Sequence, residues 1–156
     1  MATRSTIALE HSDGTVQSVY CHFDGYLSHN GNILQEHYSD PAKLQELIAL
    51  GSMSSLAKEI GQQHPFTNPF QYGSDEYNAF RAQYQNWCVF YSRDRGEDLV
   101  INEFADLKAY ILQAEREEYN YILRQIDGSP VWFVESHETD GFIRLDEALQ
   151  SEILEE

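Results

Sequence analysis

Two clusters of polar side chains in this sequence have the residue types and spacing to do chemistry. In the segment YCHFDGY, His22 and Asp24 lie beside a glycine turn, a usual position for exposed functional side chains. In the segment YSRDRGED, Arg93 and Asp94 follow an apolar run, and a guanidinium group there can bind a phosphate or carboxylate through two hydrogen bonds. If all four side chains converge in the fold, they form a pocket for a small ligand such as a nucleotide, or a hydrolytic site.

Both clusters also have a structural interpretation. Carboxylates outnumber the arginines around Arg93, which favours ion pairing of Arg93 and Arg95 with their acidic neighbours. His22, Asp24 and His29 lack a recognised metal-binding spacing, so we expect no metal and no other cofactor. The chain also lacks a nucleophile-elbow, Walker A or dinucleotide-binding motif. We therefore expect no catalytic residues and no enzymatic activity.

The overall charge limits the classes of partner. The 156 residues contain 26 Asp and Glu but only 10 Lys and Arg, a formal net charge of -16. Direct binding of nucleic acid is not expected, because such a site needs a cationic surface, and docking on anionic membranes is disfavoured. No apolar run approaches the roughly 20 residues of a membrane-spanning helix. The first residues, MATRSTIALEHSDG, lack the apolar stretch of a signal peptide, which predicts a cytoplasmic protein.

The acidic residues are concentrated in the C-terminal part of the chain. Residues 97–156 contain 16 acids and 4 bases. An amphipathic helix is expected over residues 101–115, and its spacing places Glu103, Asp106 and Glu117 along one flank. Carboxylates spaced along a helix can imitate the phosphates of duplex DNA, which carries one charge per roughly 1.7 Å. The candidate partner-binding acids are Glu103, Asp106, Glu117, Glu118, Glu152 and Glu155; the alternative is that these acids only keep the protein soluble.

The hydrophobic pattern predicts an α+β fold. Two hairpins are expected, over residues 5–23 and 119–136, with a third strand over 87–92. Asp40 and Pro41 have the types of a helix N-cap and first helical residue, and Gly51 ends that helix. The remaining expected elements are a turn over 52–55 and helices over 33–38, 56–60, 101–115 and 146–154. Together they predict an antiparallel or mixed sheet with helices packed on one face, in a single domain over 1–156 with a surface excursion at 62–86.

Several stretches of the sequence resemble small acidic proteins encoded by bacteriophages and mobile elements. The resemblance lies in RSTIA at the start, YCHFDGY, LGSMSSL over residues 50–56, and RDRGE over residues 93–97. It covers about the first 60 residues and residues 87–97. It implies a setting, and no catalytic residues.

Charge and setting together give the expected function. We expect a phage-type inhibitor that binds a host nucleic-acid-binding or defence protein, such as a restriction, CRISPR or repair component, through DNA mimicry. The aromatic excursion at 62–86 would supply apolar contacts. The alternative is the small-ligand pocket of His22, Asp24, Arg93 and Asp94.

Overall fold

The computed structural model of this chain describes residues 2–65 and 67–155, with residues 152–155 described by their backbone alone. Its strands are β1 (Ser5–Glu10), β2 (Val16–Cys21), β3 (Met53–Ser55), β4 (Val89–Phe90), β5 (Asn102–Phe104), β6 (Tyr119–Ile126), β7 (Ser129–Ser136) and β8 (Ile143–Arg144). Its helices are a π-helical turn η1 (Leu27–Gly31), α1 (Asn32–His37), α2 (Pro41–Ala49), α3 (Asp75–Tyr84), α4 (Tyr91–Arg95), α5 (Leu107–Gln113) and α6 (Leu145–Glu155).

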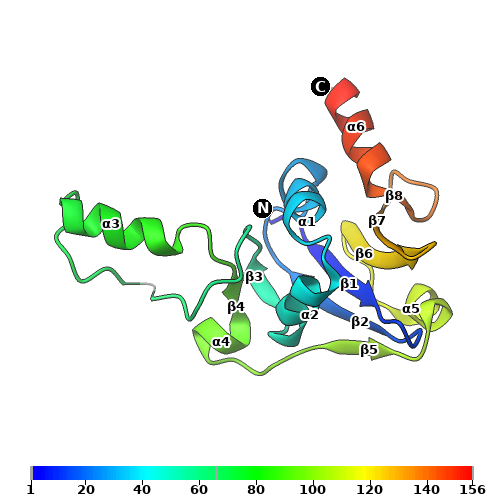
Figure 1. The fold of residues 1–156 in the computed structure, drawn as a ribbon, viewed down its shortest axis with the longest axis horizontal. Coiled ribbons are helices and arrows are strands. Elements are labelled where there is room, and N and C mark those ends of the chain that lie inside the picture. The colour runs from blue at the N-terminus through cyan, green and yellow to red at the C-terminus, as the bar shows by residue number, and fades with distance from the viewer. Residues whose placement is uncertain (1, 66, 156) are drawn as a thin grey trace.

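The described residues form one mixed, open sheet of eight strands with helices packed alongside (Figure 1). The strands run in the order β4-β3-β2-β1-β6-β7-β8, and β5 pairs with β2 off this path. The pairs β1–β6 and β2–β3 are parallel, and the others are antiparallel. The expected α+β class with a mixed sheet is therefore confirmed. No helix in the described part of the chain is long and apolar enough to span a membrane.

The first hairpin forms as the sequence predicts. Ile7 on β1 pairs with Val19 on β2, and both are fully buried. The turn is fixed by Asp13, whose Oδ1 accepts hydrogen bonds from the backbone N–H and hydroxyl of Thr15 at 3.0 and 2.6 Å. The second hairpin, β6–β7, is also confirmed, and β1 joins the two hairpins because Ile7 lies opposite Tyr121 of β6.

The sheet has a large core on one face and a smaller core on the other. Ile7 and Leu9 belong to the large core, which also contains buried residues of α1, α2 and α6. Ala8, between them, belongs to the smaller core with Tyr110 of α5, because successive residues of a strand point to opposite faces. Helices α1, α2 and α6 thus lie on one face of the sheet, and α5 covers the other, whereas the sequence predicts helices on one face only.

Helix α2 begins where its capping residues predict. The Asp40 carboxylate accepts a hydrogen bond of 3.0 Å from the backbone N–H of Ala42, and Pro41 is the first helical residue. The buried stripe is Leu44, Leu47 and Ile48, and each such side chain contributes about 1.5–3 kcal/mol when fully buried.

The prediction of a helix over residues 101–115 is wrong. Residues 102–104 form β5, in which Glu103 pairs with Gln17 of β2, and the helix is limited to α5. Asp106 caps α5, since its Oδ1 accepts from the backbone N–H of Ala109 at 2.8 Å. Pairing with the open edge of β2 therefore overrides the helical pattern. Glu103, Asp106 and Glu117 do not share a helical flank.

Two shorter expectations also differ. The turn expected over residues 52–55 is strand β3, because Met53 pairs with Cys21 of β2 and Phe90 of β4, and residues 56–60 form no helix. The strand expected over residues 87–92 is limited to β4. The chain then turns into α4, so Arg93 and Asp94 lie in a short helix.

The described residues of the segment 62–86, here called the arm, are 62–65 and 67–86, and they project away from the sheet (Figure 1). The arm contains α3, whose N-cap Ser74 accepts a hydrogen bond of 3.1 Å from the backbone N–H of Tyr77. No residue of α3 is buried. The aromatic rings of the arm instead contact one another, in the pairs Phe70–Phe80, Phe80–Tyr84 and Tyr72–Tyr77.

Candidate functional site

Three acidic residues from two segments line one cavity on the α5 side of the sheet. Glu103 comes from β5, and Glu115 and Glu117 come from the link between α5 and β6. The cavity has a volume of about 440 Å³, and we call it the acidic hollow. Its wall contains no Lys or Arg. The other lining residues are two aromatic ones, four polar ones and one alanine: Tyr20, Phe104, Thr6, Ser18, Asn102, Gln113 and Ala114.

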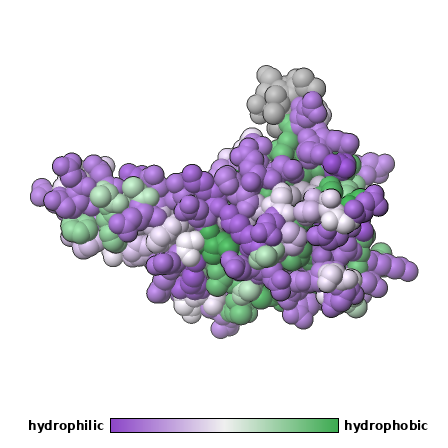
Figure 2. Space-filling model, in the orientation of Figure 1, coloured by the Kyte–Doolittle hydropathy of each residue, from purple (hydrophilic) through white to green (hydrophobic). Residues whose placement is uncertain are grey.

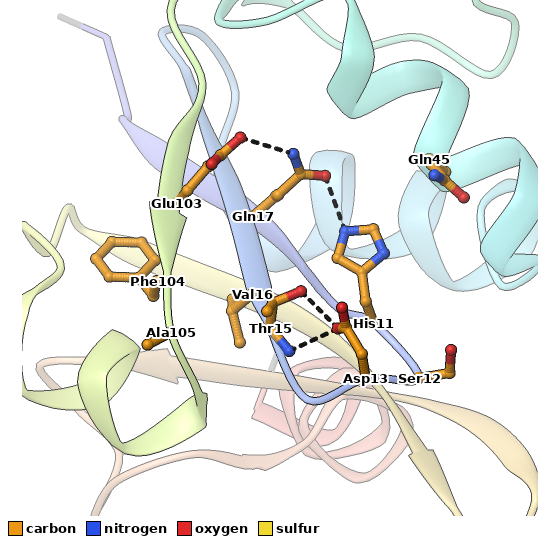
Figure 3. A pocket seen from close by; sticks show the side chains of 10 residues that line it. All are labelled: His11, Ser12, Asp13, Thr15, Val16, Gln17, Gln45, Glu103, Phe104 and Ala105. Carbon is orange, nitrogen blue, oxygen red and sulfur yellow. Dashed lines mark hydrogen bonds between the residues drawn. The ribbon is translucent and has the colours of Figure 1, made fainter.

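A second, more open hollow of about 690 Å³ adjoins the first and shares Glu103 and Phe104 with it (Figure 3). A chain of hydrogen bonds crosses it. Gln17 donates from Nε2 to the carboxylate of Glu103 at 3.2 Å, and its Oε1 lies 2.8 Å from Nε2 of His11. The imidazole therefore carries its hydrogen on Nε2, because the amide oxygen can only accept. This chain holds the Glu103 carboxylate on the side of β5 that faces Gln17 and His11, opposite to the ring of Phe104.

The arginines that form ion pairs bind carboxylates other than those of the acidic hollow. Four of them pair with a carboxylate: Arg93 with Asp94, Arg116 with Glu135, Arg124 with Glu10, and Arg144 with Asp146. Among the described side chains, Glu103, Glu115 and Glu117 have no ion-pair partner. The negative charge of these three acids is thus not neutralised by an ion pair among the described side chains.

The other expected partner-binding acids lie elsewhere or have other contacts. The carboxylate of Asp106 is used as the N-cap of α5. Glu118 is exposed next to Glu117. Glu152 and Glu155 belong to α6, and their side chains lie outside the described residues.

Arg93 and Asp94 form a closed structural unit, which we call the arm clamp. The side chain of Asp94 is fully buried and accepts hydrogen bonds from the backbone N–H groups of His64 and Phe90, each at 2.7 Å. Arg93 donates to Asp94 and to the carbonyl oxygens of Ile60, Gly61 and Cys88. These bonds tie both ends of the arm to β4 and α4, and they occupy the guanidinium group that a ligand would need.

The hydrogen bonds of the arm clamp also set the charge state of Asp94. Burial opposes ionisation of this carboxyl, but the hydrogen bonds from Arg93 and from two backbone N–H groups outweigh it. The pKa of Asp94 is held below its ordinary value, so the carboxylate is ionised at neutral pH.

His22 and Asp24 do not join the arm clamp. His22 forms a hydrogen bond of 2.6 Å with the hydroxyl of Tyr20, and its ring contacts Phe23. Asp24 lines a different cavity, together with His29 and His37. No hydrogen bond or ion pair connects either residue with Arg93 or Asp94 in the described structure, so the four do not assemble into one pocket there.

Both cysteines are buried thiols whose ionisation is disfavoured. Cys21 and Cys88 are both buried and free. Burial raises the pKa of Cys21 to about 12 and also raises the pKa of Cys88. Among the described residues, no three His, Cys, Asp or Glu side chains are placed to share a metal ion.

Comparison with protein-family models, with curated proteins and with solved structures finds no match to this chain. The candidate site is therefore inferred from the geometry of the structure alone. Sequence reasoning missed Glu115, because the helical spacing assumed for residues 101–115 placed it off the acidic flank. Its position two residues before Glu117, in a loop, was the available signal.

Proposed function

We propose that this chain is a non-enzymatic inhibitor of bacteriophage or mobile-element origin that acts in the cytoplasm of the host cell. It binds a nucleic-acid-binding or defence protein through the basic surface that this partner uses for nucleic acid. One observation carries the proposal: Glu103, Glu115 and Glu117 line one hollow that has no Lys or Arg in its wall.

Elementary electrostatics supports this function. Carboxylates that lie close together without counter-charge repel one another, and a cationic partner relieves this repulsion when it binds. A negative hollow on a protein of net charge -16 also attracts a basic surface over distance, which accelerates association at low salt. The face of the molecule that Figure 2 shows is mostly hydrophilic, with small apolar patches.

The arm would supply the apolar contacts of the interface. Phe70 and Tyr72 are among its exposed side chains, and Tyr72 is 83% exposed. Exposed aromatic side chains are enriched at protein interfaces, where they bury a large area with little loss of side-chain entropy. The arm clamp holds this aromatic segment at a fixed attachment to the sheet.

The proposal is tested by capture from a bacterial host lysate, with bound proteins identified by mass spectrometry. The bait variant neutralises the acidic hollow through Glu103→Gln, Glu115→Gln and Glu117→Gln. Its matched control neutralises three exposed acids elsewhere through Glu36→Gln, Glu46→Gln and Glu138→Gln. Both variants change the net charge equally, so they separate the hollow from the overall charge.

We expect the wild type and the control to capture the same nucleic-acid-binding or defence protein, and the hollow variant to lose it. Duplex DNA should displace the captured protein. Salt should also release it, because the screening length falls from about 10 Å at 0.1 M to about 3 Å at 1 M. Equal capture by both variants, with no competition from DNA, would contradict the proposal.

A further inference from the structure

A further cavity, of about 430 Å³, differs from the two hollows described above in its lining residues. It lies where η1 and α1 approach the residues after β3 and the end of the arm, and we call it the basal cavity. Its lining includes one lysine, two histidines, one aspartate, two amide residues and one tryptophan: Lys58, His29, His37, Asp24, Gln85, Asn86 and Trp87. Its volume falls in the range of small-molecule sites.

A buried network orients the imidazole of His29. Asn30 is fully buried, and its Nδ2 group points to the hydroxyl of Ser5, the thiol of Cys21 and the carbonyl oxygen of Phe23, at 3.3–3.5 Å. Its Oδ1 lies 2.9 Å from Nδ1 of His29 and accepts its hydrogen. Of the two ring nitrogens, Nδ1 is engaged by Asn30, and Nε2 is the one that can contact a ligand. Much of the YCHFDGY segment serves to place this histidine.

The indole of Trp87 is also held in place. A Cβ atom on Gly61 would lie 2.2–2.6 Å from three ring carbons of Trp87, so the glycine backbone packs directly on the indole. Trp87 also forms a parallel bridge with Glu59. The ring is therefore held by Gly61 on one side, and Trp87 is the aromatic residue of the basal cavity that could stack on a planar ligand.

Asp24 completes the wall in an unusual backbone conformation. Its φ is +58°, which few residues other than glycine adopt, and its carbonyl oxygen accepts a hydrogen bond of 3.2 Å from the backbone N–H of Asn30. The same loop therefore positions both the carboxylate and the imidazole of His29. A carboxylate can only accept hydrogen bonds when ionised, which suits ligand hydroxyl groups.

We propose that the basal cavity binds a nucleoside monophosphate. Lys58 and the two imidazoles contact the phosphate, the base stacks on Trp87, and Asp24 accepts hydrogen bonds from the ribose hydroxyls. The acids of the distant hollow oppose this only weakly, because charges beyond about 8 Å are screened at physiological salt. Glu36, whose carboxylate lies 3.8 Å from Nε2 of His37, is a nearby opposing charge. This site is independent of the partner-binding proposal.

The test is a titration of the full ¹⁵N-labelled chain followed through the two tryptophan indole N–H signals. Trp87 reports on the basal cavity, and Trp132, buried in the large core, is the internal reference. The probes are adenosine 5′-monophosphate, adenosine and inorganic phosphate. We expect the monophosphate to shift the Trp87 signal saturably, and adenosine and phosphate each to bind at least about tenfold more weakly, since each lacks one group of contacts.

Matched variants assign the contact. Lys58→Gln removes an exposed ammonium of the cavity, and Lys108→Gln removes an exposed ammonium on α5. The first should weaken binding of the monophosphate about tenfold, and the second should leave it unchanged. Equal binding of adenosine and its monophosphate, equal effects of the two variants, or no saturable shift of the Trp87 signal would each overturn the proposal. None of these outcomes depends on capture of a protein by the acidic hollow.

Discussion

The carboxylate of Asp94 accepts a hydrogen bond of 2.7 Å from the backbone N–H of His64, which lies 30 residues earlier in the chain. This bond joins α4 to the first residues of the arm. Because Arg93 binds the carbonyl oxygens of Ile60 and Gly61, the two side chains hold both a donor and acceptors of the same backbone segment. Arg93 and Asp94 of the RDRGE motif thus have a structural role at the base of the arm.

Replacing the buried carboxylate should destabilise the protein strongly. Asp94→Asn places an amide NH₂ against one of the backbone N–H groups and leaves Arg93 without its counter-charge, so we expect a loss of about 3 kcal/mol or more in the free energy of unfolding. Asp98→Asn, at an exposed acid, should change it by less than about 0.5 kcal/mol. Urea denaturation of both variants measures the difference. Equal stabilities would contradict the role assigned to Asp94.

The same carboxylate should contribute to acid denaturation. Its pKa is lowered in the folded protein, so its contribution to stability is fully present above the pKa of the unfolded chain and is lost as the pH falls through the folded value. The stability difference between the wild type and Asp94→Asn should therefore shrink below about pH 4. Denaturation curves across this pH range check it, and a difference that stays constant in acid would contradict the lowered pKa.

Two glycines of positive φ provide a matched pair for the contact with Trp87. Gly61→Ala and Gly73→Ala meet similar backbone strain, since their φ values are +69° and +83°. Only the new methyl group at residue 61 would overlap the indole, whereas residue 73 has open space around it. We expect Gly61→Ala to be less stable than Gly73→Ala by about 1–3 kcal/mol in thermal or urea denaturation. A similar loss for both would show that the packing on Trp87 does not matter.

The acids of the hollow should contribute nothing to folding. Glu115→Gln with Glu117→Gln should leave the free energy of unfolding unchanged, or raise it by up to about 1 kcal/mol at low salt, because like charges are removed. Glu135→Gln, which removes the partner of Arg116, should lower it by about 1 kcal/mol instead. Denaturation at low and high salt distinguishes the two. A clear loss of stability in the hollow variant would mean that its carboxylates have a structural role.

The local signals in the sequence were reliable where a contact lies nearby in the chain. The turn at Asp13 and the N-cap at Asp40 use hydrogen bonds to residues two positions away, and both were predicted. The helix expected over residues 101–115 failed because Glu103 pairs with Gln17, 86 residues away, on the open edge of β2. Helical spacing carries no information about such a partner strand.

The candidate sites show the same division. Ion pairing of Arg93 with Asp94 was the favoured interpretation, and the structure contains that pair. The contacts of the pair with residues 60–64 were not accessible, because they depend on how the arm returns to the sheet. Asp24 was predicted to share a pocket with His22, Arg93 and Asp94, whereas the cavity that it lines contains His29 and His37.

The parallel pairing of β1 with β6 has a consequence for how the chain folds. Thr6 on β1 donates a hydrogen bond of 2.8 Å to Asn120 on β6, across 114 residues of sequence. The central strand β1 therefore leaves the ribosome 114 residues before its partner β6, whereas its other neighbour, β2, follows it directly. The β1 edge of the first hairpin therefore stays unpaired until residue 123 has emerged from the ribosome. Contacts of such long range predict slow folding.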